Sequence, residues 1–152
     1  DWYGSFNATL RYKDFDLFAD FYIVQGVTRI NSILANGEFW KAEMNGPVVP
    51  YYTDDNPSLQ WPKANANAAW LKHLNSFAAQ DASYMRLRTV TVGYNFNSIV
   101  NDLFNLKSGR LYFTGTNLFT MTDFLSYSPE QDLRAGVFPE TLNMTLGLKL
   151  NF

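Results

Sequence analysis

Few residues in this sequence have the chemistry for catalysis or metal binding. The single histidine, His73, has no cysteine and no group of acidic residues beside it, so the partners of a catalytic or metal-ligating imidazole are missing. We interpret His73 as a solvated loop residue. Asp54 and Asp55 could bind calcium, but they lack the spacing of oxygen-bearing residues in a calcium-binding loop, and the pair is interpreted as the start of a turn. The sequence therefore predicts neither an enzyme nor a cofactor.

Five other residues are candidate contacts for a substrate or a partner protein. Exposed tryptophans can stack on a sugar or pack against a neighbouring protein, and one stretch holds Trp40, Trp61 and Trp70. Alternatively, these rings only hold a long loop in place. Arg86 and Arg88 could line an opening used by an anionic substrate, or could pair with nearby acidic residues. The sequence alone leaves both alternatives open.

The composition excludes several classes of protein. The chain has 152 residues, enough for one ordinary domain, and no cysteine, so it has neither a disulfide framework nor a thiolate metal site. With a net charge of −2 and no basic patch interleaved with aromatic residues, nucleic acid is not an expected partner. No run approaches the roughly 18 consecutive apolar residues of a membrane-spanning helix. Aromatic residues reach 17%, which fits the aromatic girdles of membrane β-barrels.

The elements that must position these residues are clearest at the end of the chain. Residues 142–152 alternate between apolar and polar side chains and end on Phe152. Successive side chains of a strand point to opposite faces, so the run predicts a strand with one apolar and one polar face. Its length suits a tilted strand that crosses a bilayer. The same alternation occurs in half-buried strands of soluble antiparallel sheets, so this run does not decide between the two.

Four earlier segments also have strand character, and the five predicted strands cover residues 5–12, 15–24, 84–96, 110–119 and 140–152. In the second strand, Asp16 and Asp20 share the more polar face. Carboxylates facing lipid are costly, so both are predicted to face the lumen of a barrel, as is Lys149 in the last strand. In the third strand, Arg86 and Arg88 lie at alternate positions that are otherwise apolar. This indicates either a β-bulge or a part of the strand outside the membrane.

The connections between these strands alternate in length. Lys13-Asp14 is a predicted tight hairpin turn and residues 97–108 form a second short connection, whereas residues 25–82 and 120–139 are long loops. Long loops without secondary structure are uncommon in compact soluble domains. Outer-membrane barrels, in contrast, have long extracellular loops and short periplasmic turns. The pattern favours a membrane barrel and predicts that Phe152 ends in the periplasm.

Five strands are too few to close such a barrel, because the smallest have about eight. An open sheet in hydrocarbon would leave backbone N–H and C=O groups unpaired, at a cost of several kcal/mol each. We therefore expect an all-β fold, in which residues 1–152 are an antiparallel transmembrane segment, the C-terminal part of a larger barrel. The first residues show no signal peptide, so we expect either a mature chain or a piece of a longer one.

Several motifs resemble one family of outer-membrane proteins. Residues 83–96 read SYMRLRTVTVGYNF and resemble the YLRLRNVTLGYN strand of SusC/RagA-like TonB-dependent transporters. Residues 110–120, RLYFTGTNLFT, resemble that family's LRLYVSGQNLFT, and residues 128–130, SPE, are similar to its DPE with serine in place of aspartate. YKDFDL at residues 12–17 resembles a YKGFDL hairpin, and Phe138-Pro139 followed by the LGL at residues 146–148 resembles the closing segment. The matches occur in one order over nearly the whole chain.

This resemblance implies the C-terminal strands of a large, roughly 22-stranded barrel in the outer membrane of a Bacteroidota-type bacterium. Members of the family import oligosaccharides or peptides, driven by TonB and the proton gradient, and a SusD-like surface lipoprotein caps their extracellular side. Their plug domain and TonB box lie toward the N-terminus. Both are absent from this sequence, so TonB would contact the missing region.

Phe152 has an implied role of its own. A terminal aromatic residue on an amphipathic last strand resembles the signal read by the barrel-assembly machinery, so we expect that machinery and outer-membrane lipid among the partners. Two functions stay open. One is a segment of a nutrient transporter; the other is a structural or assembly component of the outer membrane that uses a SusC-like barrel as a protein-docking scaffold. A soluble β-sandwich binding module is a third alternative.

Overall fold

A computed structural model describes residues 1–35, 48–57, 63, 76, 78–96, 106–131, 138 and 140–152. This part of the chain contains seven β-strands in two antiparallel sheets, so its fold is all-β, as predicted. Among the same residues, no helix has both the length and the apolar character needed to traverse a bilayer. The chain divides into two compact units, of which the first comprises Asp1–Gly26, Ser83–Thr122 and Glu140–Phe152, and the second Val27–Ala82 and Asp123–Pro139.

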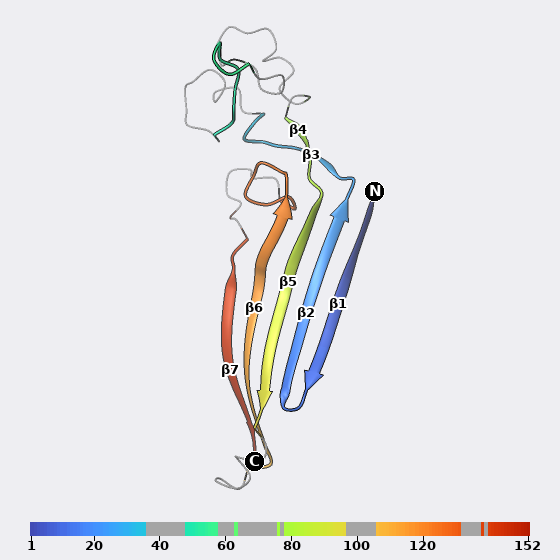
Figure 1. Ribbon diagram of the computed structural model, residues 1–152, viewed down its shortest axis with the longest axis vertical. Helices are drawn as coiled ribbons and strands as arrows, with labels where there is room; N and C mark the ends of the chain where they lie inside the picture. Colours follow the sequence, from blue (N-terminus) through green and yellow to red (C-terminus); the bar gives the residue numbers. More distant parts are fainter. Residues whose placement is uncertain are drawn as a thin grey trace. The chain divides into compact units, whose positions relative to one another are not determined.

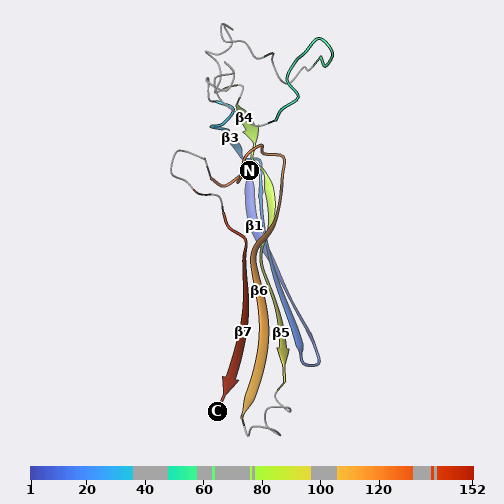
Figure 2. The ribbon, with the colours of Figure 1, turned by 90° about the vertical axis from the view of Figure 1, so that its left-hand side faces the viewer.

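The first unit is one five-stranded sheet in the order β1-β2-β5-β6-β7, with every neighbouring pair antiparallel (Figure 1). Seen from the side, its strands form a single layer (Figure 2). Its strands are β1 (Trp2–Tyr12), β2 (Phe15–Gln25), β5 (Tyr84–Asn95), β6 (Ser108–Thr122) and β7 (Asn143–Asn151). β1 and β6 are longer than the predicted ranges, because backbone pairing continues where the side-chain alternation ends.

The register gives this sheet two chemically different faces. One row of paired residues crosses all five strands with only apolar side chains, namely Leu10, Leu17, Val92, Phe113 and Leu146. The adjacent row on the other face contains Thr9, Phe18, Thr91, Thr114 and Thr145. Residues of the apolar row are open on their outer side, since Leu146 is 72% exposed and Leu10 is 64% exposed. The alternation predicted for single strands therefore adds up to one continuous apolar face.

This sheet has almost no hydrophobic core of its own. Of the buried hydrophobic residues in the described part of the chain, only Tyr84 belongs to the sheet, and the other five lie in the second unit. Soluble monomers rarely expose apolar patches larger than a few hundred Å², whereas the strands of membrane barrels have an apolar outer face. A single layer with one apolar and one polar face is the architecture of a barrel wall.

A β-bulge interrupts the pairing of β2 with β5. Asp20 pairs with Thr89, but the next residue of β2, Phe21, pairs with Leu87, so Arg88 has no opposite residue in β2. An extra residue on one strand reverses the side-chain parity beyond it. The bulge was one of the two alternatives that the sequence left open, and the register confirms it.

The change of parity places Arg86 on the polar face. Arg86 pairs with Tyr22 on β2 and with Thr120 on β6. β6 has its own irregularity opposite the bulge, where Asn117 adopts a left-handed conformation with a φ of 54°. Asparagine tolerates this conformation better than most residues, so the local sequence fits the distortion.

The second unit contains ordered structure within the segment predicted as one long loop. β3 (Thr28–Ile30) pairs with β4 (Ala79–Asp81), so residues 25–82 are not a loop throughout. Strands of three residues are too short to show a repeating alternation, and the sequence pattern gave no sign of them.

Asn31, which is 1% exposed, organises the chain after β3. Its Oδ1 accepts hydrogen bonds from the backbone N–H groups of Ile33 and Leu34, at 3.1 and 3.3 Å. Its Nδ2 donates to Gln80 Oε1 at 2.9 Å and to the Leu125 carbonyl at 2.7 Å. One buried amide therefore joins three segments of this unit, and every polar atom of its side chain is satisfied.

Candidate functional site: the polar face of the sheet

Charged side chains gather at the two ends of the polar face, and hydroxyl groups occupy its middle. Thr91 of β5 and Thr114 of β6 lie side by side with their hydroxyl oxygens 3.0 Å apart. The turn end of the sheet is where β1 joins β2 and β7 reaches the C-terminus (Figure 1). The opposite end is the loop end, where β2, β5 and β6 enter or leave the long connections.

The main contact at the turn end is an ion pair between strands that are not neighbours. Arg110 on β6 donates from Nη2 to Asp16 Oδ2 on β2 at 2.5 Å, across the intervening strand β5. The side chains are 37% and 20% exposed, respectively. Asn95 of β5 donates from Nδ2 to Asp16 Oδ1 at 3.3 Å and to the Asp14 carbonyl at 3.2 Å. The carboxylate of Asp16 thus accepts hydrogen bonds from two strands.

Gly93 makes this long-range contact possible. It is the β5 residue paired with Asp16, so any side chain there would stand directly beneath the ion pair. A Cβ atom built at Gly93 would lie 2.6 Å from Arg110 Nη2 and 2.6 Å from Asp16 Oδ1. These separations are too short for a real Cβ, and therefore a side chain at this position would displace the pair.

A shallow pocket of about 330 Å³ opens beside this ion pair. Its lining residues are Arg11, Lys13, Phe15, Asp16, Asn95 and Arg110. Three are cations and one is a carboxylate, so the lining carries a net charge of +2. The Nε of Arg110 is buried and has no hydrogen-bond partner among the described residues. Positive charge and an unused N–H donor are features of a site for an anion.

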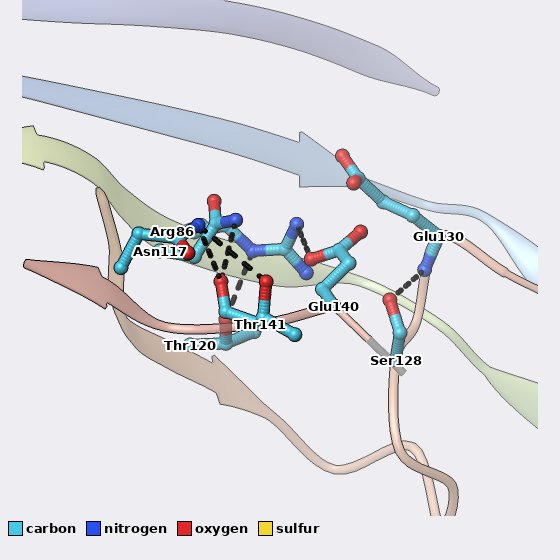
Figure 3. Close-up of polar contacts among 8 residues, drawn as sticks. Arg86, Asn117, Thr120, Ser128, Glu130, Glu140 and Thr141 are labelled. Atoms are coloured by element: carbon cyan, nitrogen blue, oxygen red, sulfur yellow. Dashed lines mark hydrogen bonds and ion pairs between the residues drawn. The ribbon is translucent and has the colours of Figure 1, made fainter. Parts of the chain in front are cut away.

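The loop end of the polar face is built around Arg86, which is 3% exposed. Figure 3 shows its guanidinium between Thr120 and Glu140: Nε donates to Thr120 Oγ1 at 2.9 Å, and Nη1 forms an ion pair with Glu140 Oε2. Burying a guanidinium is costly unless a carboxylate and hydrogen-bond acceptors surround it. Of the two roles predicted for Arg86, the pairing with an acidic residue is the one seen.

Arg88 takes part in a separate contact with aromatic rings. Its guanidinium carbon lies 3.8 Å from the centroid of the Tyr22 ring, and the ring of Tyr84 lies 6.0 Å from that of Tyr22. Arginine over a tyrosine face gains about 0.5–1 kcal/mol at an exposed site. The bulge residue is therefore held on the same face as Arg86.

The remaining predicted residues are placed as follows. Asp16 and Asp20 lie on the polar face of β2, and Lys149 lies on the same face of β7, opposite Arg110. Phe152 follows the end of β7 and is 83% exposed. Trp40, Trp61, Trp70 and His73 lie outside the described residues.

The turn interpretation of Asp54 and Asp55 is correct. They connect Thr53 to Asn56, whose backbone groups exchange two hydrogen bonds of 3.1 Å. No group of three or more potential metal ligands occurs among the described residues.

Ser128 in the second unit accounts for the substitution in the DPE-like motif. Ser128 is buried and its Oγ accepts a hydrogen bond from the Glu130 N–H at 3.2 Å (Figure 3). An aspartate side chain can make the same local contact with a backbone N–H two residues on. Serine therefore preserves the turn at this position.

Sequence reasoning missed Arg110, Asn95 and Glu140. Arg110 and Asn95 lie at polar positions of their strands. Their contacts with Asp16 depend on how the strands are paired and on the small size of Gly93, and the pattern of one strand does not show the pairing. Glu140 was counted as the start of the last strand. The sequence gives no signal for Glu140, because the burial of Arg86 that requires an acid nearby is seen only in the structure.

No family model matches the sequence. Two proteins of Formosa agariphila are similar to it: TonB-dependent receptor P26 is 30% identical over 162 residues, which cover 97% of this chain and 16% of that protein. TonB-dependent receptor P3 is 28% identical over 166 residues, which cover 100% of this chain and 16% of that protein. The chain thus spans about a sixth of the length of these relatives.

Solved structures show the same fold. The RagAB peptide importer in its open-open state superposes with a TM-score of 0.70 at 23% identity, covering 99% of this chain and 17% of that chain. The structure of the RagAB peptide transporter gives a TM-score of 0.71 at 22% identity.

The fold and its two faces define a segment of a membrane β-barrel. The similarity over the whole length of the chain assigns the segment more closely. It belongs to the TonB-dependent receptor family, as the SusC/RagA-like motifs predicted.

Proposed function

We propose that this sheet is part of the wall of an outer-membrane, TonB-dependent nutrient importer. Its apolar face contacts lipid and its polar face lines the lumen. The observation that carries the proposal is the apolar row that crosses all five strands from Leu10 to Leu146. A lipid-facing wall needs apolar residues on the outer face of every strand, whereas a soluble sheet of one layer would expose these apolar residues to water.

The open edges of the sheet support membership of a larger barrel. β1 and β7 are the outermost strands of the five, and each has backbone groups on its outer side that need partners in hydrocarbon. In this proposal, further strands of a longer polypeptide pair with both edges. The turn end, with Phe152, faces the periplasm, and the long loops face the outside of the cell.

The two faces can be tested in the full-length protein reconstituted in lipid vesicles. Nitroxide labels are attached to Thr145→Cys and Leu146→Cys, which are neighbours on β7 and lie on opposite faces. The label at 146 should collide mainly with lipid-soluble oxygen, and the label at 145 mainly with a water-soluble nickel chelate. Equal accessibility of the two labels to both reagents would rule out a lipid-facing wall.

The transported solute is proposed to be a peptide or an oligosaccharide, taken up with a SusD-like surface lipoprotein on the extracellular side. The names of the similar proteins support this class, since they are TonB-dependent receptors and a peptide importer. The plug domain and TonB box would belong to a part of the polypeptide outside this sequence.

The transport proposal is tested in cells that lack the full-length gene. Uptake of labelled peptides and oligosaccharides should fall in these cells and should stop in the parent strain when a protonophore removes the proton gradient. A tagged protein should also co-purify with a surface lipoprotein. Unchanged uptake of every solute, together with a partner bound at the long loops, would favour a docking scaffold instead.

A further inference from the structure

We propose that the pocket at the turn end of the polar face binds a carboxylate group. Arg11, Lys13 and Arg110 would hold it, and Asn95 and Asp16 position Arg110. The lining residues come from β1, β2, the turn between them, β5 and β6. The proposed carboxylate site is therefore independent of the identity of the transported nutrient.

The charge balance of the pocket favours an anion. Asp16 is opposite Arg11 in the β1–β2 register, yet its carboxylate pairs with Arg110 two strands away. Among the described residues, no ion pair involves Arg11 or Lys13, and the lining residues keep a net charge of +2. The pocket therefore has one more cation than a single bound carboxylate would neutralise, which favours capture of an anion.

The hydrogen bonding of Arg110 is incomplete among the described residues. A guanidinium has five N–H donors in a planar fork. Nη2 donates to Asp16, but Nε is buried without an acceptor. An unsatisfied buried donor in a native structure points to a missing water, ion or ligand.

Lys13 has a strained backbone conformation. It lies in the tight turn between β1 and β2 with a φ of 53°, a left-handed conformation that costs a residue with a side chain about 1–2 kcal/mol. Glycine would avoid this cost. The Lys13 Nζ lies 5.4 Å from the centroid of the Tyr12 ring, and strained residues cluster at ligand sites, so a lysine in this turn fits a need for its charge at the pocket.

The volume of the pocket limits the size of the ligand. A pocket of about 330 Å³ is at the lower limit of small-molecule sites and is too small for a folded segment. It can hold the carboxylate of an acidic side chain from another part of the same polypeptide, or a free acid such as succinate. Both sources offer the same planar pair of oxygens, for which arginine is well suited.

The test uses the full-length protein in detergent and follows the acylation rate of Lys13 with an amine-reactive ester, read by mass spectrometry. Succinate is the probe, and chloride at equal ionic strength is the control. Lys107, which is exposed but does not line the pocket, serves as the reference lysine in the same sample. Two variants are compared, Arg11→Gln and the charge-preserving Arg11→Lys, because Arg11 makes no ion pair whose loss would disturb the fold.

If free acids bind, succinate should slow acylation of Lys13 but not of Lys107. Arg11→Gln should then raise the succinate concentration for half-protection roughly tenfold, as expected for loss of one charge-assisted hydrogen bond, and Arg11→Lys should retain most of the protection. If an acidic side chain of the same polypeptide occupies the pocket, Lys13 is protected without succinate, and Arg11→Gln exposes it. Lys13 reactivity that matches Lys107 in the wild type and in both variants, with or without succinate, would overturn the proposal.

Discussion

An arginine on the apolar face should destabilise the protein far more than an arginine on the polar face. Leu146 and Thr145 are adjacent on β7, and the register places them on opposite faces. β7 has nine residues, so at about 3.3 Å per residue and a tilt of roughly 40° it covers about 23 Å of membrane thickness. Leu146 is one residue from the centre of the strand, roughly 3 Å from the midplane if the strand spans the hydrocarbon symmetrically.

At that depth, Leu146→Arg should lower the free energy of unfolding by about 2–4 kcal/mol. This corresponds to a roughly 30- to 700-fold change in the folding equilibrium. Thr145→Arg should change it by less than about 0.5 kcal/mol, because its charge stays in water. Leu146→Ala separates the loss of apolar contact from the cost of the charge.

The measurement is equilibrium unfolding in urea of the full-length protein folded into lipid vesicles, followed by tryptophan fluorescence and by the gel mobility of unheated samples. The two arginine variants differ only in which of two neighbouring residues of β7 is replaced. Equal destabilisation by the two arginines, or a larger effect of Thr145→Arg, would show that the apolar face does not contact lipid.

Three further changes have expected outcomes. Arg86→Ala leaves Glu140 without its buried partner and should cost about 2–4 kcal/mol in the same urea assay, whereas Arg86→Lys should cost less; equal losses would refute the role of the charge. Asn31→Ala should speed hydrogen exchange at the Ile33 and Leu34 amides by loss of a contact of about 1–3 kcal/mol; unchanged exchange at these two amides would contradict the capping role. Deletion of Phe152 should reduce the amount of folded protein in the outer-membrane fraction, and normal assembly would disprove its role as a signal.

The apolar face could be predicted from the sequence because strand periodicity is a local property. The last strand shows a clear alternation, so Leu146 and Thr145 can be assigned to opposite faces without knowledge of the neighbours, whereas the two faces of residues 110–119 are hard to tell apart in the sequence. The same reasoning assigned Asp16, Asp20 and Lys149 to one face. The bulge at Arg88 was also foreseeable, since two arginines on an apolar parity conflict with the rest of their strand.

The contacts between strands could not be predicted in this way. The pairing of Asp16 with Arg110 needs two registers and the absence of a side chain at Gly93, and none of these is visible in one strand alone. Glu140 was hidden for a different reason: it precedes β7, and its ion pair with Arg86 depends on where the preceding connection ends. β3 and β4 were missed because three residues are too few for a period of two to show.

Two glycines on the polar face, Gly93 and Gly147, explain how a single layer can hold its large polar side chains in place. The row of paired residues that crosses the five strands here is Arg11, Asp16, Gly93, Tyr112 and Gly147, so each glycine has a residue with a large side chain beside it. The Asp16–Arg110 pair lies over Gly93, and the Tyr112 ring lies over Gly147. These large side chains thus lie over glycines of the sheet, and no second layer is needed to support them. A side chain at Gly93 would remove this support from Arg110, so the position of the proposed carboxylate site follows from the glycine as much as from the cations.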